Sequence, residues 1–405
     1  GMSRLTTVAT SRASADQRAG RAGRTAPGHA YRLWSQIEHG TRQKHRTPEI
    51  LQTDLAGVAL ELAAWGVSAD PERPVGGLEF IDPPPTAALR QARELLADLR
   101  AIDEEGRLTS LGRDMLALPV HPRLARMVAI DRSPLACVVA SLLDERDIFR
   151  GRPDDLPVDL ALRVAVVSGA SGHDLADRGA VHRLRDRAEE LGRRVGIAVD
   201  RHAIDHDRTG EVLLHAFPDR LAGRRRTGQF TLRSGSGAFV PSDDPLADVP
   251  FIVAADLDGR RDRARVRLAA AVDVDTVVAD AGDDIKEQRT LEWNRDRDDL
   301  VETVDRRLGA IRLGSRTRPP EAGADTTAAL MQRVRETSLA VLGWSAASTS
   351  LRRRVEFLHR TRGEPWPDWS TEALLASVDE WLAPYLPGAT SRRDLDQLDV
   401  AMVLR

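Results

Sequence analysis

The sequence is poor in several residue types, and each shortage excludes a class of protein. Its one cysteine, Cys137, excludes an internal disulfide and a cysteine-rich zinc cage, and its apolar neighbours predict a small core residue. Lysine occurs only at Lys44 and Lys286. Nearly all positive charge is therefore carried by arginine, whose planar fork suits phosphate groups.

Long apolar runs are also missing. No stretch of about 18 uncharged apolar residues occurs, and the first residues lack the apolar run of a secretory signal. We therefore predict a cytoplasmic protein that does not use a membrane. The 59 basic and 62 acidic side chains leave a net charge of −3, which argues against a disordered chain or a uniformly basic nucleic-acid sleeve but allows a local basic track.

The 405 residues suffice for two to four domains, and the pattern of apolar residues changes along the chain. Residues 5–10 read as a short strand before an Arg/Gly block, so we expect the chain to begin inside a larger unit. Thr47, Pro48 and Glu49 predict the start of a helix that ends near Gly66. A second helix over residues 89–99 and a short apolar segment after it suggest a winged helix.

The next two regions differ in period. Helical patterns continue from Pro122 to about Arg201, which predicts a small bundle. A period of two then predicts short strands of a small OB-like β-barrel, at residues 212–214, 230–232, 251–253, 266–268 and 277–278. The rest is mixed and then helical, with segments at residues 300–308, 326–342, 351–358 and 374–386 and an exposed loop at 319–323.

The Arg/Gly block carries the clearest chemistry. Arg18, Arg21 and Arg24 are spaced by three and are expected mostly on one helical face, with glycines between them that allow close backbone approach. Such a face suits a triphosphate, because arginine donors stabilise the charge that spreads over a transferring phosphoryl group. Gln17 is placed to orient a water or contact the phosphate. Considered alone, the block is also compatible with a solvated stretch that binds anions loosely.

Residues 14–24 resemble motif six of the DEAH-box helicases of superfamily two, whose pattern is Q-R-x-G-R-x-G-R. Segments similar to the winged-helix and ratchet regions of that family follow in order, at residues 47–50, 80–84 and 108–119. Later segments look like the C-terminal region of bacterial HrpB-type helicases, at residues 217–222, 253–258, 354–358, 366–370 and 380–386. The resemblance covers essentially the whole chain.

The resemblance implies a multidomain α+β protein. Its expected parts are a remnant of the second RecA-like lobe (1–46), a winged helix (47–118), a helical ratchet-like bundle (119–206), an OB-like β domain (207–282) and an HrpB-type C-terminal extension (283–405). It also implies that Gln17, Arg21 and Arg24 face the nucleotide phosphates, with Arg21 or Arg24 as the arginine finger. Arg18 is expected to make a structural contact or one across the cleft.

The sequence contains neither the G-x-x-x-x-G-K-[ST] phosphate loop nor the Asp-Glu-Ala-His box that this resemblance requires for ATP hydrolysis. We therefore expect a C-terminal half of an ATP-dependent RNA helicase, truncated at both ends, whose missing N-terminal lobes hold ATP and Mg²⁺. The chain alone is expected to bind no cofactor tightly and to hydrolyse no ATP.

Weaker signals concern nucleic acid and metal. Arg224, Arg225 and Arg226 beside Phe230 fit a basic track with a stacking ring, as single-stranded RNA requires, with DNA as the alternative. The competing interpretation is an exposed, charged turn. Arg352, Arg353 and Arg354 predict a charged helix face, with an RNA phosphate contact as the alternative.

Histidines and tryptophans give less specific signals. His202 and His206 lie four apart among acids, but no second ligand pair accompanies them, so we predict a solvated loop and no metal site. His121 is expected to cap or pack, and Trp366, Trp369 and Trp381 are expected to pack.

Two functions from different classes follow. The first is the helicase portion described above, which supplies the arginine finger and grips RNA. The second is a stand-alone module, derived from helicase accessory domains, that binds RNA or another protein. An intact Gln17, Arg21 and Arg24 favours the first, and the absent phosphate loop favours the second.

Overall fold

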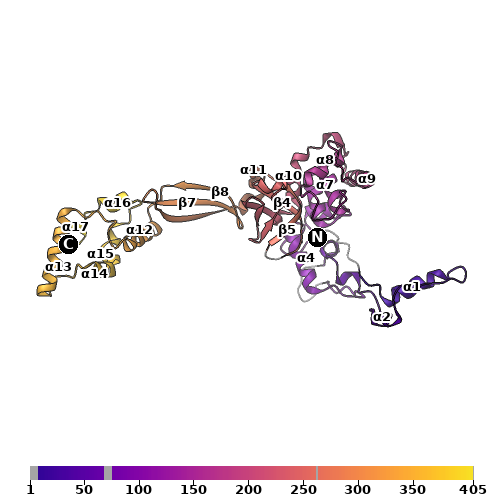
Figure 1. Cartoon of the computed structure of the whole chain (residues 1–405), viewed down its shortest axis with the longest axis horizontal. Coiled ribbons are helices and arrows are strands. Elements are labelled where there is room, and N and C mark those ends of the chain that lie inside the picture. Colours follow the sequence, from indigo (N-terminus) through magenta and orange to yellow (C-terminus); the bar gives the residue numbers. More distant parts are fainter. Residues whose placement is uncertain (1–7, 68–74, 261–262, 405) are drawn as a thin grey trace. The chain divides into compact units, whose positions relative to one another are not determined.

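The computed structural model describes residues 8–67, 75–260 and 263–404, and the chain divides into two compact units, residues 1–277 and 278–405. Both units mix helices and strands (Figure 1), so the predicted α+β class is confirmed at this level. Of the strand predicted at residues 5–10, the first three residues lie outside the described ones. Residues 8–10 have no regular structure.

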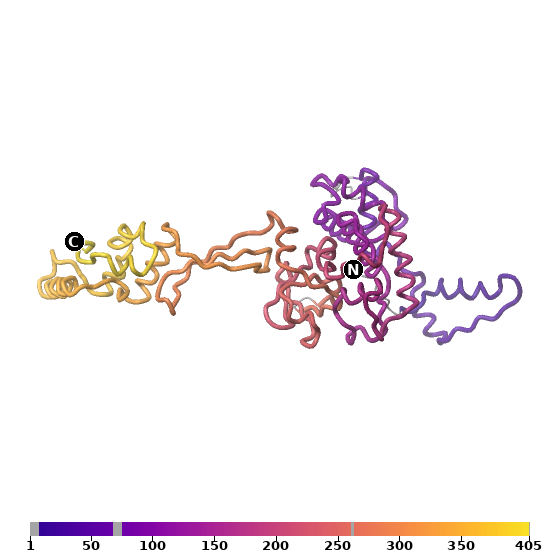
Figure 2. Tube along the Cα trace, turned by 90° about the horizontal axis from the view of Figure 1, so that it is seen from above, coloured from indigo at the N-terminus to yellow at the C-terminus, as the bar shows by residue number. Residues whose placement is uncertain are grey.

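The first unit opens with a segment, residues 8–46, that holds α1 (Arg12–Ala22) and α2 (Gln36–Thr41). This segment runs out and back (Figure 2), and the backbone N–H groups of Arg12 and Ala13 donate to the carbonyls of Gln43 and Lys44 at 2.9 and 3.0 Å. Its two ends are thereby held together by backbone hydrogen bonds.

In the region predicted as a winged helix, the described residues 47–67 and 75–118 contain a 3₁₀ turn, three helices and an isolated bridge. Its elements are η1 (Glu49–Leu51), α3 (Ala56–Ala64), α4 (Thr86–Asp98), α5 (Ser110–Leu116) and the antiparallel bridge between Ile102 and Leu108. The predicted helix start at Thr47 is wrong: Glu49 opens only the 3₁₀ turn. The α-helix begins at Ala56, whose N–H donates to the Asp54 carboxylate at 2.7 Å.

Five helices form the predicted bundle. They are α6 (Pro122–Asp131), α7 (Pro134–Asp144), α8 (Leu160–Ser168), α9 (Arg178–Val195) and α10 (Thr209–Ala216), with η2 (Arg201–Ala203) and η3 (His206–Arg208) before the last. Side-chain N-caps start the first four, and prolines occupy the first helical position of α6 and α7. Cys137 on α7 is fully buried, as predicted, and burial raises the pKa of its thiol to about 11.

The segment at residues 212–214 is helical, so the strand predicted there is wrong. It belongs to α10, where Val212, Leu213 and Leu214 are all buried. Gly210 near its start lies so close to the Ala271 carbonyl oxygen that a Cβ would approach it to 1.8 Å. A short buried apolar run has no visible period, which is why it can be mistaken for a strand.

The β part of the first unit is a closed five-stranded barrel in the order β1-β2-β3-β5-β4. Its strands are β1 (Leu221–Arg226), β2 (Gln229–Leu232), β3 (Gly237–Phe239), β4 (Phe251–Leu257) and β5 (Arg263–Ala271); η4 (Pro218–Arg220) precedes it and η5 (Pro245–Asp248) lies between β3 and β4. All neighbours pair antiparallel except β3 and β5, which are parallel. Inward side chains such as Phe230, Leu232 and Val266 fill the interior. Residues 277–278, predicted as a strand, lie in the helix α11 (Val274–Ala281).

The second unit combines a three-stranded antiparallel sheet with a group of helices. The sheet has the order β6-β7-β8, with β6 (Lys286–Asn294), β7 (Asp299–Leu308) and β8 (Ile311–Arg318), after η6 (Gly282–Asp284). The helices are α12 (Ala324–Glu336), α13 (Ala346–Arg362), α14 (Thr371–Ala376), α15 (Val378–Trp381), α16 (Arg392–Gln397) and α17 (Val400–Val403), with η7 (Ala383–Tyr385). They gather at one end of the sheet (Figures 1 and 2).

Two features of the second unit bear on the predictions. Residues 319–323 have no regular structure and are mostly exposed, as predicted for a loop. Trp369 is 9% exposed in the helical core, and Trp381 packs against that core, whereas Trp366 is 40% exposed. The packing predicted for the three tryptophans is therefore confirmed for Trp369 and Trp381, and Trp366 lies outside the core.

Candidate functional site

The helix α1 presents the arginine block to solvent. The Ser11 side chain accepts from the backbone N–H of Ser14 at 3.2 Å and caps its N-terminus. Gln17 and Arg21, four residues apart, lie on one side of the helix, and both are exposed. The helix ends at Ala22, so Arg24 lies in the following turn. The expectation of three arginines on one helical face is therefore wrong for Arg24.

The turn after α1 is closely packed. A Cβ at Gly28 would come within 1.9 Å of the Ala22 carbonyl oxygen, so a larger residue there would force the turn apart. Glycine at this position therefore allows the chain to pass close to the end of α1.

Charged and aromatic side chains of residues 32–42 contact one another and α1. Arg32 forms an ion pair with Asp16 at 2.5 Å and a hydrogen bond with His39 at 3.1 Å. Arg42 binds Glu38 at 2.7 Å, and its guanidinium lies 4.1 Å from the Trp34 ring centre. By contrast, Gln17, Arg18, Arg21 and Arg24 make no side-chain hydrogen bond or ion pair with the described residues. These four side chains are therefore free to contact a ligand. Of the two contacts expected of Arg18, the one across the cleft stays a prediction.

The barrel arginines divide into one paired and two free side chains. Arg224 reaches Asp248 at 3.2 Å, and Thr227 donates to the same carboxylate at 2.8 Å. Arg225 and Arg226 are exposed and form no ion pair within the described ranges. The basic track therefore consists of Arg225 and Arg226, with Arg224 partly neutralised.

Phe230 cannot serve as the predicted stacking ring. It is 1% exposed and belongs to the barrel core, with Leu232 and Ala222. Ala222 faces Leu232 across the β1–β2 pair, and side chains two apart on a strand share a face. The register therefore turns Phe230 inward, and the prediction of a nucleic-acid contact at this residue is wrong.

A buried arginine links the bundle to the start of the barrel. Arg123 on α6 donates to both carboxylate oxygens of Asp219 at 2.6 and 2.9 Å and to the Ala216 carbonyl at 3.1 Å. Burial raises the pKa of Asp219, but the hydrogen bonds and charge of Arg123 outweigh it and hold that pKa below its ordinary value. Arg123 and Arg220 both lie over the Phe217 ring, at 5.3 and 4.8 Å.

Sequence reasoning missed this link, although it singled out residues 217–222 by resemblance. The two partners are 96 residues apart, and no local pattern joins them. The available signal was Arg123 itself, a charged residue among the apolar residues that begin α6, which indicates a buried partner for its charge.

His121 caps a helix and contacts an acid. Its Nδ1 accepts from the backbone N–H of Arg123 at 3.3 Å at the start of α6. Its buried Nε2 lies 3.5 Å from the Asp54 carboxylate. That contact lowers the pKa of Asp54 well below its ordinary value, although partial burial acts in the opposite direction. The predicted capping role is confirmed.

The paired histidines lie in two short turns. Asp200 and Asp205 accept from the backbone N–H groups of His202 and Asp207 at 3.0 and 3.1 Å, which uses one carboxylate oxygen of each acid for capping. In the described part of the chain, no cluster of three or more His, Cys, Asp or Glu side chains is arranged to hold a metal ion. Across the same residues, every helix is too short or too polar to span a bilayer.

The family model for the helicase-associated domain HA2, a winged helix, matches residues 92–120. The match covers α5 and part of α4 and supports the winged-helix assignment of this region.

The chain is 31% identical, over its whole length, to the ATP-dependent RNA helicase HrpB of Escherichia coli (strain K12), of which it covers 48%. Two solved structures are similar over 99% of the chain: the E. coli DExH-box NTPase HrpB, with a TM-score of 0.54 and 29% identity, and the E. coli DEAH/RHA helicase HrpB, with a TM-score of 0.52 and 27% identity. The chain covers 47% and 48% of these structures. It is thus a homologue of the HrpB helicases that spans about half the length of the relatives it matches, consistent with their C-terminal portion.

Proposed function

We propose that this chain is the RNA-gripping and arginine-finger portion of an ATP-dependent RNA helicase. Gln17, Arg21 and Arg24 face the nucleotide phosphates of the assembled enzyme, and Arg21 or Arg24 is the finger. The observation that carries this proposal is that these side chains are exposed and unpaired on and after α1, while neighbouring arginines such as Arg32 and Arg42 are held in local ion pairs.

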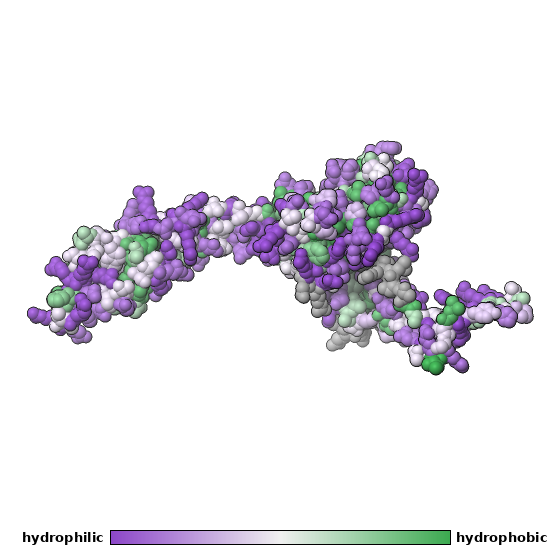
Figure 3. All heavy atoms as spheres, in the orientation of Figure 1, coloured by the Kyte–Doolittle hydropathy of each residue, from purple (hydrophilic) through white to green (hydrophobic). Residues whose placement is uncertain are grey.

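Exposed apolar side chains support the view that residues 8–46 belong to a larger lobe. Tyr31, Leu33 and Ile37 are 86%, 94% and 83% exposed, and apolar residues are visible on the surface of this segment (Figure 3). Water-exposed apolar side chains in such density mark surfaces that other protein covers. We propose that this cover is the remainder of a RecA-like lobe.

The RNA-binding part of the proposal rests on the barrel. A closed barrel of five strands in the order β1-β2-β3-β5-β4, with one parallel pair, supports an OB-like assignment, and OB-folds bind single strands. Arg225 and Arg226 supply unpaired positive charge at the end of β1. We assign the phosphate contact to these two side chains and place single-stranded RNA there.

The chain by itself is proposed to be inactive as an ATPase. The arginine finger stabilises charge on a phosphoryl group that other residues must hold together with Mg²⁺, and this sequence contains no phosphate loop. ATP and Mg²⁺ are therefore cofactors of the assembled protein.

Two hydrolysis measurements test the finger. The purified chain, with RNA, should release no phosphate from ATP above background. A full-length protein formed by joining the N-terminal half of the E. coli relative to this chain should hydrolyse ATP, and Arg21→Ala or Arg24→Ala should lower kcat by about 10³-fold. Arg12→Ala, on the same helix but outside the motif, is the control. Hydrolysis by the chain alone, or full activity in both motif variants, would contradict the proposal and favour a stand-alone binding module.

A further inference from the structure

The longest helix of the second unit, α13, has one face that is fixed to the core and one that is not. Val355 and Ser348 are buried on the inner face. The exposed residues Ala346, Ser350, Arg354 and Phe357 recur at three- and four-residue spacing, and the exposed Arg353 flanks them. We name these five residues the α13 stripe.

The three consecutive arginines of this helix have different roles. Arg352 donates to the Trp369 carbonyl at 3.0 Å and to the Thr371 hydroxyl at 2.7 Å, and it lies 5.1 Å from the Trp344 ring centre. It is therefore a structural residue, and the prediction that all three form a charged face is wrong for Arg352. Arg353 and Arg354 are exposed and form no ion pair with any described residue.

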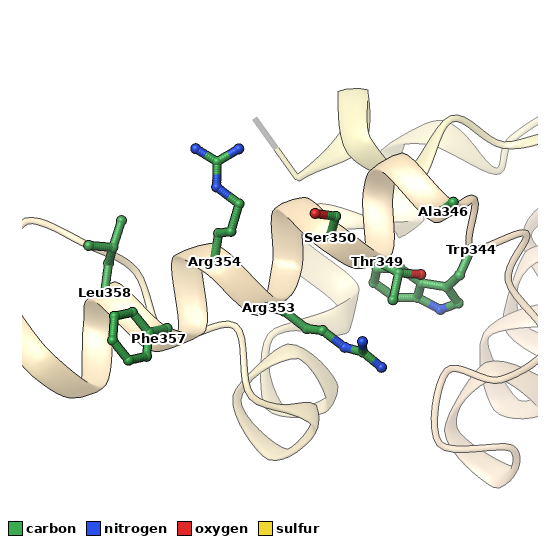
Figure 4. Close-up of a pocket in the computed structure, with 8 residues that line it drawn as sticks. All are labelled: Trp344, Ala346, Thr349, Ser350, Arg353, Arg354, Phe357 and Leu358. Carbon is green, nitrogen blue, oxygen red and sulfur yellow. The ribbon is translucent and has the colours of Figure 1, made fainter.

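A groove of about 740 Å³ follows the stripe from Trp344 to Phe357 and Leu358. Figure 4 shows the Arg353 and Arg354 side chains extending from opposite sides of the helix, with Phe357 nearer the C-terminal end of α13. The residues from Ala346 to Phe357 span about 16 Å at 1.5 Å per residue. The groove is therefore long enough for a short piece of an extended polymer.

The charge and surface chemistry of the groove select the ligand. No acidic side chain lines it, and Glu356, the one acid of α13, lines an adjoining groove instead. The Phe357 side chain is 58% exposed and is not part of the helical core. Two free guanidinium groups beside an exposed ring match a phosphate backbone with unstacked bases, because arginine binds phosphate and aromatic rings stack on bases.

We infer that the α13 stripe is a second binding site for single-stranded RNA, in which Arg353 and Arg354 contact phosphates and Phe357 stacks on a base. The ligand class rests on the proposed RNA-directed function, but the site is separate from the barrel arginines and from α1. An acidic peptide is the competing ligand, and it would use the two arginines without needing the ring.

The test measures binding of a fluorescently labelled oligouridylate to the full chain, without nucleotide, over a range of salt concentrations. Arg353→Ala with Arg354→Ala should weaken binding about tenfold at low salt and reduce the slope of log affinity against log salt by about 1.4, because each single-strand phosphate contact contributes about 0.7. Phe357→Ala should weaken binding at least about fivefold, the low end of a base-stacking contribution.

Matched controls separate local contacts from general charge. Arg312→Ala with Arg393→Ala removes the same charge from two exposed arginines outside the groove, and Tyr385→Ala removes a ring that is 48% exposed. Both controls should change the affinity less than about twofold. In a second readout, RNA that contains 4-thiouridine should crosslink to the tryptic peptide of residues 355–360 and lose that crosslink in Phe357→Ala.

The outcomes distinguish this inference from the proposed function. If the groove variants behave like their controls while Arg225→Ala with Arg226→Ala weakens binding, the α13 site is wrong and the barrel proposal stands. If the unmodified chain binds no RNA at low salt, both fail. If polyglutamate binds in a manner that depends on Arg353 and Arg354 while RNA does not, the groove takes an acidic protein and the inference is overturned.

Discussion

The segment at residues 8–46 and the five-stranded barrel are stabilised by different interactions. Ala15 is the one buried apolar side chain in the described part of the segment, whose connections are surface ion pairs and backbone hydrogen bonds. The barrel instead closes around Phe230, Leu232 and Val266. The comparison teaches that exposed arginines of the two regions differ in how their backbone is held. In the segment, an arginine such as Arg21 lies on a helix with almost no packed core. In the barrel, Arg225 lies on a strand that a closed core holds in place.

The largest effect on stability is expected when the aromatic ring of Phe230 is removed from the barrel core. Phe230→Ala should lower the free energy of unfolding by about 3–5 kcal/mol, because it leaves a cavity in a closed core. Urea titration followed by circular dichroism measures the change, with Phe357→Ala as an exposed-ring control. Unchanged stability with lost RNA binding would return Phe230 to the role predicted from sequence.

A buried arginine of the bundle, paired with the more exposed Asp147, gives the next effect. Arg163 is 2% exposed, donates to Asp147 at 2.7 and 3.0 Å and to two backbone carbonyls, and lies over the Phe149 ring. Arg163→Ala should cost about 3 kcal/mol, since those acceptors lose their donor. The exposed neighbour Arg146→Ala should cost less than about 0.5 kcal/mol in the same titration. Equal losses in the free energy of unfolding for Arg163→Ala and Arg146→Ala would show that burial does not determine how much an arginine contributes to stability in this bundle.

The Asp54–His121 contact predicts a smaller effect that depends on pH. The folded-state pKa of Asp54 is lowered, so the folded chain binds fewer protons than the unfolded chain near that pKa. The contribution is therefore present above about pH 4 and is lost as the pH falls further. Because the pair is partly exposed, it amounts to at most about 1 kcal/mol.

Asp54→Asn keeps an acceptor for the N–H of Ala56 and removes the charge. Its melting temperature should therefore fall less than that of the unmodified chain between pH 5 and pH 3. An identical fall in both proteins would mean that the contact does not stabilise the folded state.

The smallest change in stability is expected in the motif itself. Gln17→Ala, Arg21→Ala and Arg24→Ala should each alter the free energy of unfolding by less than about 0.5 kcal/mol, because their side chains are exposed and form no hydrogen bond or ion pair with any described residue. Thermal unfolding of the three variants measures this. A loss above about 1 kcal/mol would assign these residues a structural role.

Elements with a local sequence signal were predicted correctly. The predictions were wrong or missing for elements whose structure depends on contacts between residues far apart in the sequence. The helical pattern predicted from Pro122 begins where α6 begins, with that proline at its first position. The β6–β8 sheet was not predicted, and residues 300–308, placed among the mixed and helical segments, form its central strand β7. The outer strands are mostly exposed, and β7 buries Glu302 between Leu300 and Val304, so its buried positions do not read as an apolar alternation.

The candidate site shows the same limit. Gln17, Arg21 and Arg24 are contiguous in a specific pattern and were found by resemblance, whereas the inward direction of Phe230 depends on its register with β1. The ties of Arg123 to Asp219 and of Arg352 to Trp369 link separate elements and decide which arginines are free. Such ties become visible only in three dimensions.

The central claim, that the barrel grips single-stranded RNA without the nucleotide site, is tested most directly by a salt titration of RNA binding to the chain without ATP. The account predicts binding at low salt that weakens as salt rises, and a slope reduced by about 1.4 in Arg225→Ala with Arg226→Ala. Absence of binding by the unmodified chain at low salt, or an unchanged slope in that variant, would contradict it.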